Sequence, residues 1–293
     1  MKRLVVNADD FGLAESINRG ILEAHRRGIL TSATLLANGA AFESAAELAR
    51  GAPVLGVGVH LNLTDGRPVS QPSTVPSLLD ASGQFFSGPA QLAGRVLAGR
   101  ARLAEVEREW GAQIEKVGNS GVAITHLDGH KHVHMLPALF PVAVRLARQY
   151  GVRGVRLAIE RPPRLGGLLR RHAGAAGSIL MQRLRARALA LLALGSREQL
   201  ERAEMAFPMY FYGITQTGFL DGAELEAILW NLPDGTSELM CHPGYADGVL
   251  RQTGTRLVEE RERELEALTR PESRKLVAAL SIQLISYRGL NSS

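Results

Sequence analysis

The feature that most constrains the fold is a regular alternation of short apolar runs with segments of helical periodicity. The apolar runs are bounded by turn residues, which is typical of buried strands. They cover residues 4–8, 31–37, 54–60, 122–127, 152–159 and 237–241, with 282–287 as a last strand or its remnant. Strands that alternate with helices predict a mainly parallel sheet. The number of units favours a closed or nearly closed TIM-barrel-like (β/α) barrel over a doubly wound sheet, and periodicity alone leaves closure open.

The chain of 293 residues is long enough for one large α/β domain. We interpret residues 1–293 as a single domain with a basic, apolar helical insertion at 161–205. Between Arg161 and Arg197 there are eight arginines and no Asp or Glu, so the excess positive charge is concentrated there. The preferred interpretation is an oligomer contact, such as a homodimer, or a helix with a solvated basic face. The alternative is a peripheral contact with an anionic membrane.

Composition argues against several other classes of protein. The single cysteine, Cys241, allows neither an internal disulfide nor a thiolate zinc cluster, and we expect it to be a small buried hydrophobe. No run of about 18 apolar residues is present to span a bilayer, and the first residues lack the apolar region of a secretory signal. We therefore expect a cytoplasmic protein, held at the inner face of the membrane if the basic segment binds lipid. Few aromatic residues and no zinc-finger spacing argue against a nucleic-acid partner.

Acidic and imidazole side chains stand where four of the predicted strands end. Asp9 and Asp10 follow the first strand, His60 and His126 end two others, and His242 ends a late one. In β/α barrels the carboxyl ends of the strands converge on one face, where active sites are built. The sequence therefore predicts a metal-dependent hydrolase site on this rim.

Each of these residues also has a purely structural interpretation. Asp9 and Asp10 alone would favour a helix N-cap with an acidic first turn. A lone histidine such as His60 on an apolar strand is as often a hydrogen-bonded core residue as a ligand. Beside three histidine segments, the two carboxylates can instead divide the work, one binding a metal and the other accepting a proton from a metal-activated water. His242 is a candidate general acid.

The stretch 125–137 holds four of the chain's eight histidines. A neutral imidazole is a common ligand of divalent metals. His130, His132 and His134 alternate, so an extended backbone would place all three on one face. By position any of the four could be a ligand. We favour His126, at the strand end, and expect the later histidines to orient the ligands or to contact substrate.

Five motifs between Val6 and Tyr245 resemble those of one known family and occur in its order. They read V-N-A-D-D-F-G, T-S-A-T-L-L-A-N-G, V-G-V-H-L-N-L-T, T-H-L-D-G-H-K-H-V-H-M-L-P and H-P-G-Y. The chain resembles the YdjC-like carbohydrate deacetylases, which include chitooligosaccharide and hopanoid-associated deacetylases. The resemblance implies a TIM-barrel-like fold and metal-dependent removal of the acetyl group from an N-acetylated sugar.

Carried over residue by residue, the resemblance implies a site with one divalent ion, Mg²⁺ or Zn²⁺. Asp10, His60 and His126 match the family's metal ligands. Asp9 matches the position of the catalytic base, and His242 falls at the position of a general acid. The residues that we expect to contact the sugar are His130, His132, Arg156 and Tyr245.

Two other classes of function stay open. One is a different metallo-amidohydrolase, acting on another amide substrate with His132 and His134 as primary ligands. The other is a non-catalytic member that binds sugar or membrane lipid through the basic segment. If that segment contacts a membrane, a lipid-linked, hopanoid-type substrate is favoured over a soluble oligosaccharide.

Overall fold

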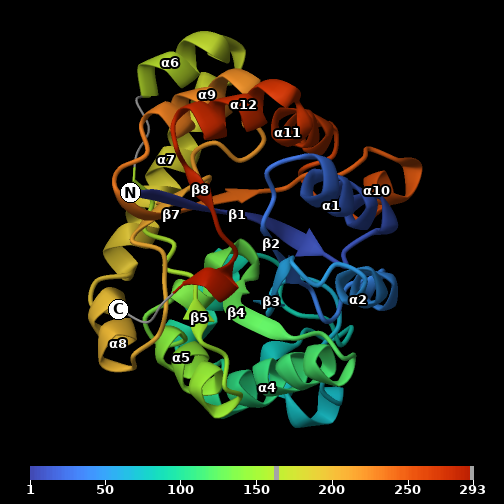
Figure 1. Cartoon of the computed structure of the whole chain (residues 1–293). Helices are drawn as coiled ribbons and strands as arrows, with labels where there is room; N and C mark the ends of the chain where they lie inside the picture. Colours follow the sequence, from blue (N-terminus) through green and yellow to red (C-terminus); the bar gives the residue numbers. More distant parts are fainter. Residues whose placement is uncertain (162–164, 291–293) are drawn as a thin grey trace.

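The computed structural model describes residues 1–161 and 165–290, and in these residues one parallel sheet of eight strands organises the fold (Figure 1). The order of the strands is β5-β4-β3-β2-β1-β7-β6, with β8 beside the start of β1. The strands are β1 Lys2–Phe11, β2 Ser32–Leu35, β3 Gly56–Leu61, β4 Ile124–Gly129, β5 Gly154–Val155, β6 Tyr210–Tyr212, β7 Gly235–Cys241 and β8 Gln283–Leu284. Every pairing between them is parallel. The predicted parallel α/β architecture is confirmed.

The sheet curves into a half-barrel whose two edges approach each other. Gly154 in β5 forms an isolated parallel bridge with Ala206, and Glu160 forms another with Phe211 in β6. The Arg161 amide donates a hydrogen bond of 2.9 Å to the Phe211 carbonyl across this seam. A barrel-like sheet of this kind brings the carboxyl ends of its strands to one rim.

The side chains of each strand alternate between the covering helices and the barrel interior. In β1, Val6 belongs to the main hydrophobic core, whereas Val5 belongs to a separate small cluster with Tyr287. Because successive side chains of a strand point to opposite faces, Asn7 and Asp9 share the interior face with Val5. The carboxyl half of the interior is therefore lined with polar groups.

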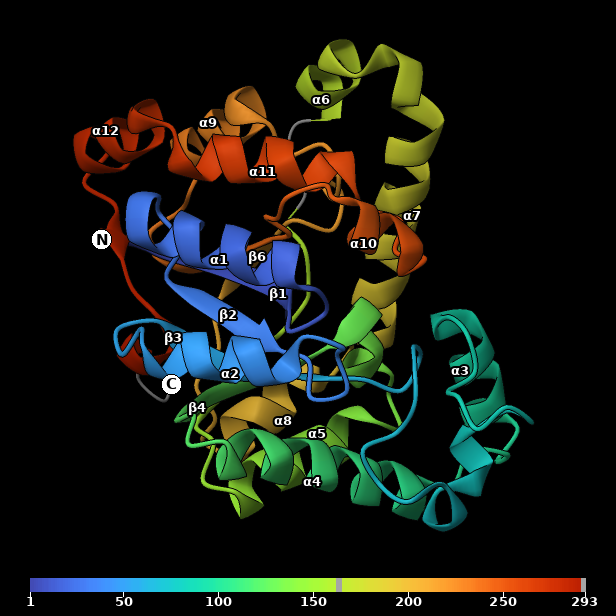
Figure 2. The same ribbon diagram turned by 90° about the vertical axis from the view of Figure 1, so that its right-hand side faces the viewer.

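Helices surround the sheet on its outer side (Figures 1 and 2). They are α1 Glu15–Arg27, α2 Phe42–Arg50, α3 Pro89–Leu97, α4 Leu103–Asn119, α5 Phe140–Gln149, α6 Leu165–Arg171, α7 Ala176–Leu192, α8 Ser196–Arg202, α9 Gly222–Trp230, α10 Gly248–Gln252, α11 Glu259–Thr269 and α12 Pro271–Ala279. Helices α1, α2, α4 and α5 contact β1, β2, β3 and β4 respectively. Each buries one apolar face against the sheet, as an amphipathic surface helix does.

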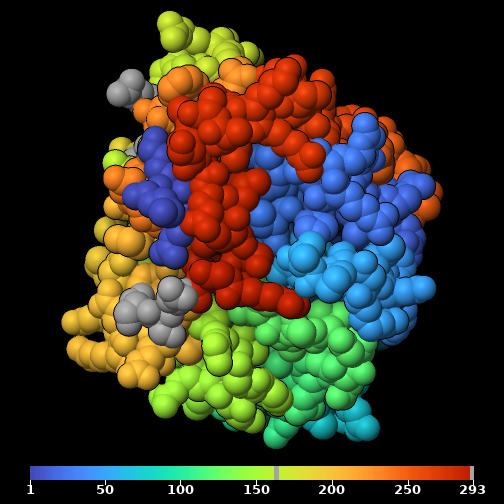
Figure 3. Space-filling model, viewed as in Figure 1, coloured from blue at the N-terminus to red at the C-terminus, as the bar shows by residue number. Residues whose placement is uncertain are grey.

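The C-terminal segment returns to the start of the sheet. Strand β8 pairs with Arg3 and Leu4 of β1, and a short 3₁₀ helix, Tyr287–Gly289, follows. Figure 3 shows this segment in red, crossing the surface beside the first residues of the chain. The Tyr287 ring is buried and stacks on His126, with 3.6 Å between the ring centroids. Tyr287 thus fills part of the barrel interior below the polar layer.

Two elements differ from their sequence predictions. The strand predicted at 152–159 contains only Gly154–Val155. Beyond it the chain bonds first to one edge and then to the other, because the Arg156 amide donates to Leu127 and the Arg161 amide donates to Phe211. The region that reads as helical from residue 90 onward is two helices, α3 and α4, with Gly99 at a φ of 66° between them.

The histidine stretch is not extended. Residues His130–Met135 form a 3₁₀ turn in which Lys131 and His132 have φ values of 52° and 58°. These left-handed conformations rotate successive side chains away from the alternation of a strand. The expectation that His130, His132 and His134 share one face is therefore wrong.

The arginine-rich segment is helical where it is described. Of the predicted insertion at 161–205, residues 162–164 lie outside the described residues, and most of the rest forms α6, α7 and α8. That the segment is an insertion stays a prediction. In the described part of the chain, no helix is long and apolar enough to cross a membrane.

Candidate active site

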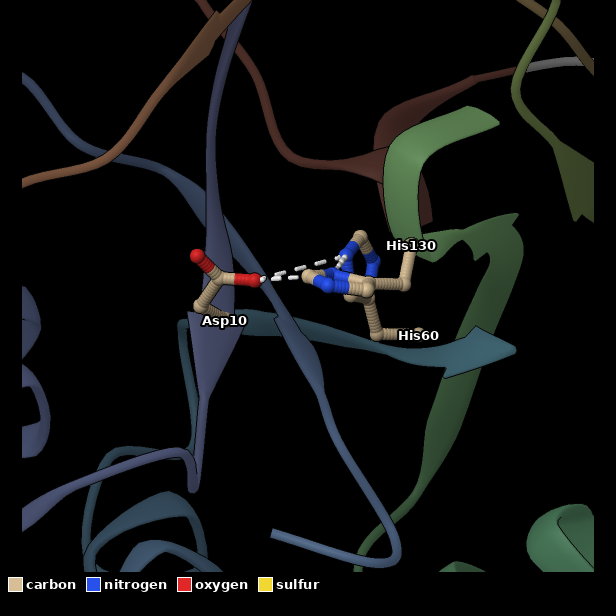
Figure 4. A group of neighbouring side chains, drawn as sticks. All are labelled: Asp10, His60 and His130. Carbon is tan, nitrogen blue, oxygen red and sulfur yellow. Dashed lines mark hydrogen bonds and ion pairs between the residues drawn. The ribbon is translucent and has the colours of Figure 1, made fainter. Parts of the chain in front are cut away.

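Asp10, His60 and His130 come together at the carboxyl rim of the sheet. They lie at the ends of β1 and β3 and directly after β4 (Figure 4). Asp10 Oδ1 is 3.7 Å from His60 Nε2 and 3.1 Å from His130 Nδ1, and the two nitrogens are 3.3 Å apart. One oxygen and two imidazole nitrogens thus converge within the reach of a single cation.

Backbone conformation separates the two adjacent carboxylates. Asp10 has a φ of 67°, a left-handed conformation that a non-glycine residue seldom adopts. It turns the Asp10 side chain toward the histidines, while Asp9 keeps its place in the barrel interior. The strain of such a conformation, of order 1–3 kcal/mol, is typical of functional sites. The two adjacent carboxylates therefore point in different directions.

Each member of the trio is oriented by a further polar side chain. His60 Nδ1 is 2.6 Å from Asp128 Oδ1, and His130 Nε2 is 2.8 Å from Asp65 Oδ2. These bonds place the donating N–H of each ring on the side away from Asp10, which leaves the other nitrogen to face it.

Charges around the trio favour a cation between its members. Burial opposes ionisation of Asp10, but the Arg261 guanidinium, 2.6 Å from Asp10 Oδ2, and His130 hold the pKa of this carboxyl well below its usual range. Burial also disfavours a charged His130, yet its hydrogen bonds to Asp10 and Asp65 raise the pKa of this imidazole to about 9. Asp10 and Asp65 therefore favour positive charge at His130.

A buried arginine ties the interior carboxylates together. The Arg156 guanidinium lies 2.7–2.9 Å from both oxygens of Asp9, 2.7 Å from Asp128 and 2.8–2.9 Å from Glu238. Burial alone would raise the pKa of Asp9, but the Arg156 charge outweighs it and holds that pKa below its ordinary value. Asp9 is therefore kept ionised, and its side chain has little freedom to move.

His126 lies deeper in the barrel than the sequence predicts. Its Nδ1 lies 2.8 Å from the Thr125 hydroxyl, its Nε2 lies 3.1 Å from Asn7, and its ring stacks on Tyr287. The ring sits where Gly58 leaves room for it, since a Cβ at that glycine would come within 2.6 Å. Burial lowers the pKa of His126 to about 3. The structure thus places His126 below the rim, outside the cation-binding group.

Strand geometry explains why His130 stands in the position expected for His126. In the β3–β4 register His60 pairs with Asp128, so the residue level with His60 is Asp128. His126 is two residues earlier on the same face, about 6–7 Å deeper in the barrel. The turn after β4 brings His130 back over His60. The sequence does not reveal this turn, because its left-handed residues are Lys131 and His132 rather than glycine.

Two expected sugar contacts point elsewhere. Arg156 is fully buried and engaged by three carboxylates, so it positions Asp9 and leaves no free surface for a sugar. The Tyr245 hydroxyl contacts Glu23 on α1. The place of a residue along the chain fixes its backbone but not the direction of a long side chain.

His132 and His242 remain near the rim. The His132 ring stands edge-on to Phe211, and its Nδ1 is buried without a hydrogen-bond partner in the described residues. His242 follows Cys241, which pairs with Ala8, so His242 lies beside Asp9 in the register of the sheet. Its amide donates to Glu264 at 2.6 Å, and burial lowers the pKa of its imidazole to about 4.

Sequence reasoning missed the residues that support the site. Asp128 could have been found from the sequence, because it lies two residues after His126 and therefore shares the same face of the strand. The sequence does not reveal Asp65, in the long loop after β3, or Arg261, on α11. Their contacts with His130 and Asp10 join distant parts of the chain.

The chain matches the family model described as "YdjC-like protein" over residues 3–279. The chain belongs to the YdjC-like family. This YdjC-like chain is 38% identical to a carbohydrate deacetylase of Geobacillus stearothermophilus, with 97% of this chain and 96% of that one covered. It is 36% identical to a chitooligosaccharide deacetylase of Salmonella paratyphi B, with 95% and 94% covered.

A solved structure supports the same family fold. It is a protein of Enterococcus faecalis V583 described as a candidate cellobiose-phosphate cleavage protein. The TM-score is 0.73 at 31% identity, and 98% of each chain is covered. The YdjC-like fold seen here therefore extends over the whole length of the relative.

Proposed function

We propose that this protein is a metal-dependent hydrolase that removes the acetyl group from an N-acetylated amino sugar. The observation that carries the proposal is the convergence of Asp10, His60 and His130 on one point at the rim. The names of the relatives, carbohydrate deacetylase and chitooligosaccharide deacetylase, support the choice of substrate class.

The donor set fits a divalent cation. Two imidazole nitrogens and one carboxylate oxygen suit Zn²⁺ and related metals, and water ligands would complete a site for Mg²⁺. The proposed ligands are Asp10, His60 and His130, with His130 in the place first expected for His126. A bound ion would acidify a water and polarise the acetyl carbonyl. Asp128 and Asp65 would hold the two rings in the ligating orientation.

The remaining roles fall to side chains around this point. Asp9, kept ionised by Arg156, accepts the proton of the attacking water. His242 lies beside Asp9 on the neighbouring strand, and because burial lowers its pKa to about 4 it starts as a neutral ring. It passes the proton taken up by Asp9 to the departing nitrogen, so that acetate and a free amine result. The unpartnered Nδ1 of His132 is the group that we propose for contact with a sugar hydroxyl.

Acetate release tests the proposal. Purified protein would be incubated with chitobiose and with N-acetylglucosamine, with and without a chelator. We expect acetate from at least one sugar, and its loss on chelation and return with added metal. If metal-loaded protein releases acetate from neither sugar, the deacetylase proposal fails.

The two alternatives have weaker support. A metallo-amidohydrolase with His132 and His134 as ligands would need these rings together, but His134 Nε2 bonds to the Arg156 carbonyl and His132 packs on Phe211. Among the described residues of the site, no contact specifically favours a non-catalytic protein that binds sugar or lipid. Metal retained in His130→Ala but lost in His132→Ala would favour the amidohydrolase.

A further inference from the structure

The outward face of α7 is apolar, although it does not pack on the described protein. Ile179, Gln182 and Ala186 form the buried face of the helix. On the opposite side Leu180, Met181, Leu184, Leu191 and Leu192 are exposed, Leu184 at 59% and Leu191 at 68%. At 3.6 residues per turn, Leu180, Leu184 and Leu191 fall on one line. They form an apolar ridge about 16 Å long, at about 1.5 Å per residue.

Arginines flank this ridge on both sides. By helical spacing Arg187 borders the ridge on one side, and Arg185 lies on the other side beyond Met181; both arginines are exposed. The segment 161–197 contains no acidic residue that could neutralise them. An exposed apolar ridge with an arginine on either side has the chemistry of a helix that lies in the headgroup region of an anionic bilayer.

The same charges argue against a second copy of the chain as the occupant. A two-fold interface would place this face against itself, and Arg185 and Arg187 of both copies would meet with no acidic partner from the segment. Figure 2 shows α7 at the periphery of the fold, where it can lie flat on a surface.

We propose that the ridge of α7, defined by Leu180, Leu184 and Leu191, docks this protein on an anionic lipid surface. The helix also lies near the catalytic rim, because Gln182 donates to the carbonyl of Thr217, which follows β6. Docking would therefore hold the rim close to the lipid, within reach of a sugar carried on a lipid anchor. This last consequence rests on the proposed deacetylase function, whereas the docking itself does not.

Vesicle co-sedimentation tests the docking. The probes are vesicles of phosphatidylcholine alone and vesicles with about one third phosphatidylglycerol. We expect the full-length protein to bind only the anionic vesicles, and less at high salt. The R185Q/R187Q variant should bind at least about tenfold more weakly, since each basic residue near such a surface contributes roughly fivefold. L180Q/L184Q/L191Q should lose binding as well.

The control variant is V54Q/W230Q, which changes two exposed apolar residues outside α7. It should bind like the wild type, and circular dichroism should show all variants folded. The proposal is overturned if the wild type does not bind anionic vesicles, or binds neutral vesicles equally well. It is also overturned if the control variant loses as much binding as the α7 variants. So does a wild-type dimer that L180Q/L184Q/L191Q converts to monomer. Acetate release from soluble sugars should be the same in all variants, which separates this test from that of the proposed function.

Discussion

At the scale of single residues, the direction of a side chain decides its role more than its position along a strand. The strand ends predict Asp9, Asp10, His60 and His242; in the structure Asp10 and His60 meet at the rim, whereas Asp9 faces the interior on Arg156 and His242 lies beside Asp9. His126 was identified in the same way, yet its ring occupies the interior. A sequence shows where a strand ends, but the level of each residue depends on the register with its neighbour.

The variant Asp9→Asn tests whether Asp9 acts as the catalytic base or as a metal ligand. Asparagine keeps the shape but cannot accept the proton of the attacking water, so turnover should fall about a hundredfold to ten-thousandfold. Metal content should stay at the wild-type level, measured by elemental analysis of the folded protein. Loss of the metal would instead make Asp9 a ligand.

Gly58→Ala tests the packing of His126. An added Cβ would lie 2.6–2.7 Å from three atoms of the imidazole ring, which Tyr287 prevents from moving away. We expect a loss of about 1–3 kcal/mol in the free energy of unfolding, typical of overpacking. Gly94→Ala on α3 is the matched control, because its Cβ meets nothing within 4 Å. It should be neutral or stabilise by up to about 1 kcal/mol. Equal effects in urea unfolding would show that Gly58 is not tightly packed.

At the scale of elements, α4 orders the long loop that follows β3. Residues 65–89 read as an irregular segment, and the structure shows how backbone amides in it are satisfied. Buried Glu109 accepts from the amides of Val69 and Ser70 at 2.9 Å each, and Glu105 accepts from Ser77 at 2.7 Å. The same loop carries Asp65 to His130.

Glu109→Ala should loosen this loop. Two backbone amides would lose their acceptor, at a cost of about 1–3 kcal/mol, and limited proteolysis should cut within 65–89 sooner than in the wild type. Glu107→Ala, on the same helix, removes only an exposed pair with Arg145 and should cost about 0–1 kcal/mol. If both variants are cut at the same rate, Glu109 does not anchor the loop.

At the scale of the whole molecule, the alternation of apolar runs predicted the parallel α/β class because it reflects burial that every strand shares. The sequence could not predict the seam between β5 and β6. There the backbone amide of Arg156 bonds to one edge of the sheet and that of Arg161 bonds to the other. Nor could the sequence predict that Tyr287, near the C-terminal end, would fill part of the barrel interior. Both features depend on contacts between residues far apart in the chain.

Tyr287→Ala tests the role of this C-terminal segment. The ring stacks on His126, and its hydroxyl lies 2.6 Å from Glu238 in the Arg156 network. Its removal should cost about 3–5 kcal/mol, as for other buried aromatic side chains, measured by urea unfolding. Arg288→Ala, its exposed neighbour, should have little effect. A similarly small effect of Tyr287→Ala would mean that the barrel interior is stable without the segment.

The metal content of His130→Ala and His126→Asn, measured in protein shown to be folded, tests the central claim most directly. The account predicts about one divalent ion per wild-type chain, loss of that ion in His130→Ala, and retention in His126→Asn, because His126 already uses both ring nitrogens within the barrel. Retention in His130→Ala together with loss in His126→Asn would contradict it.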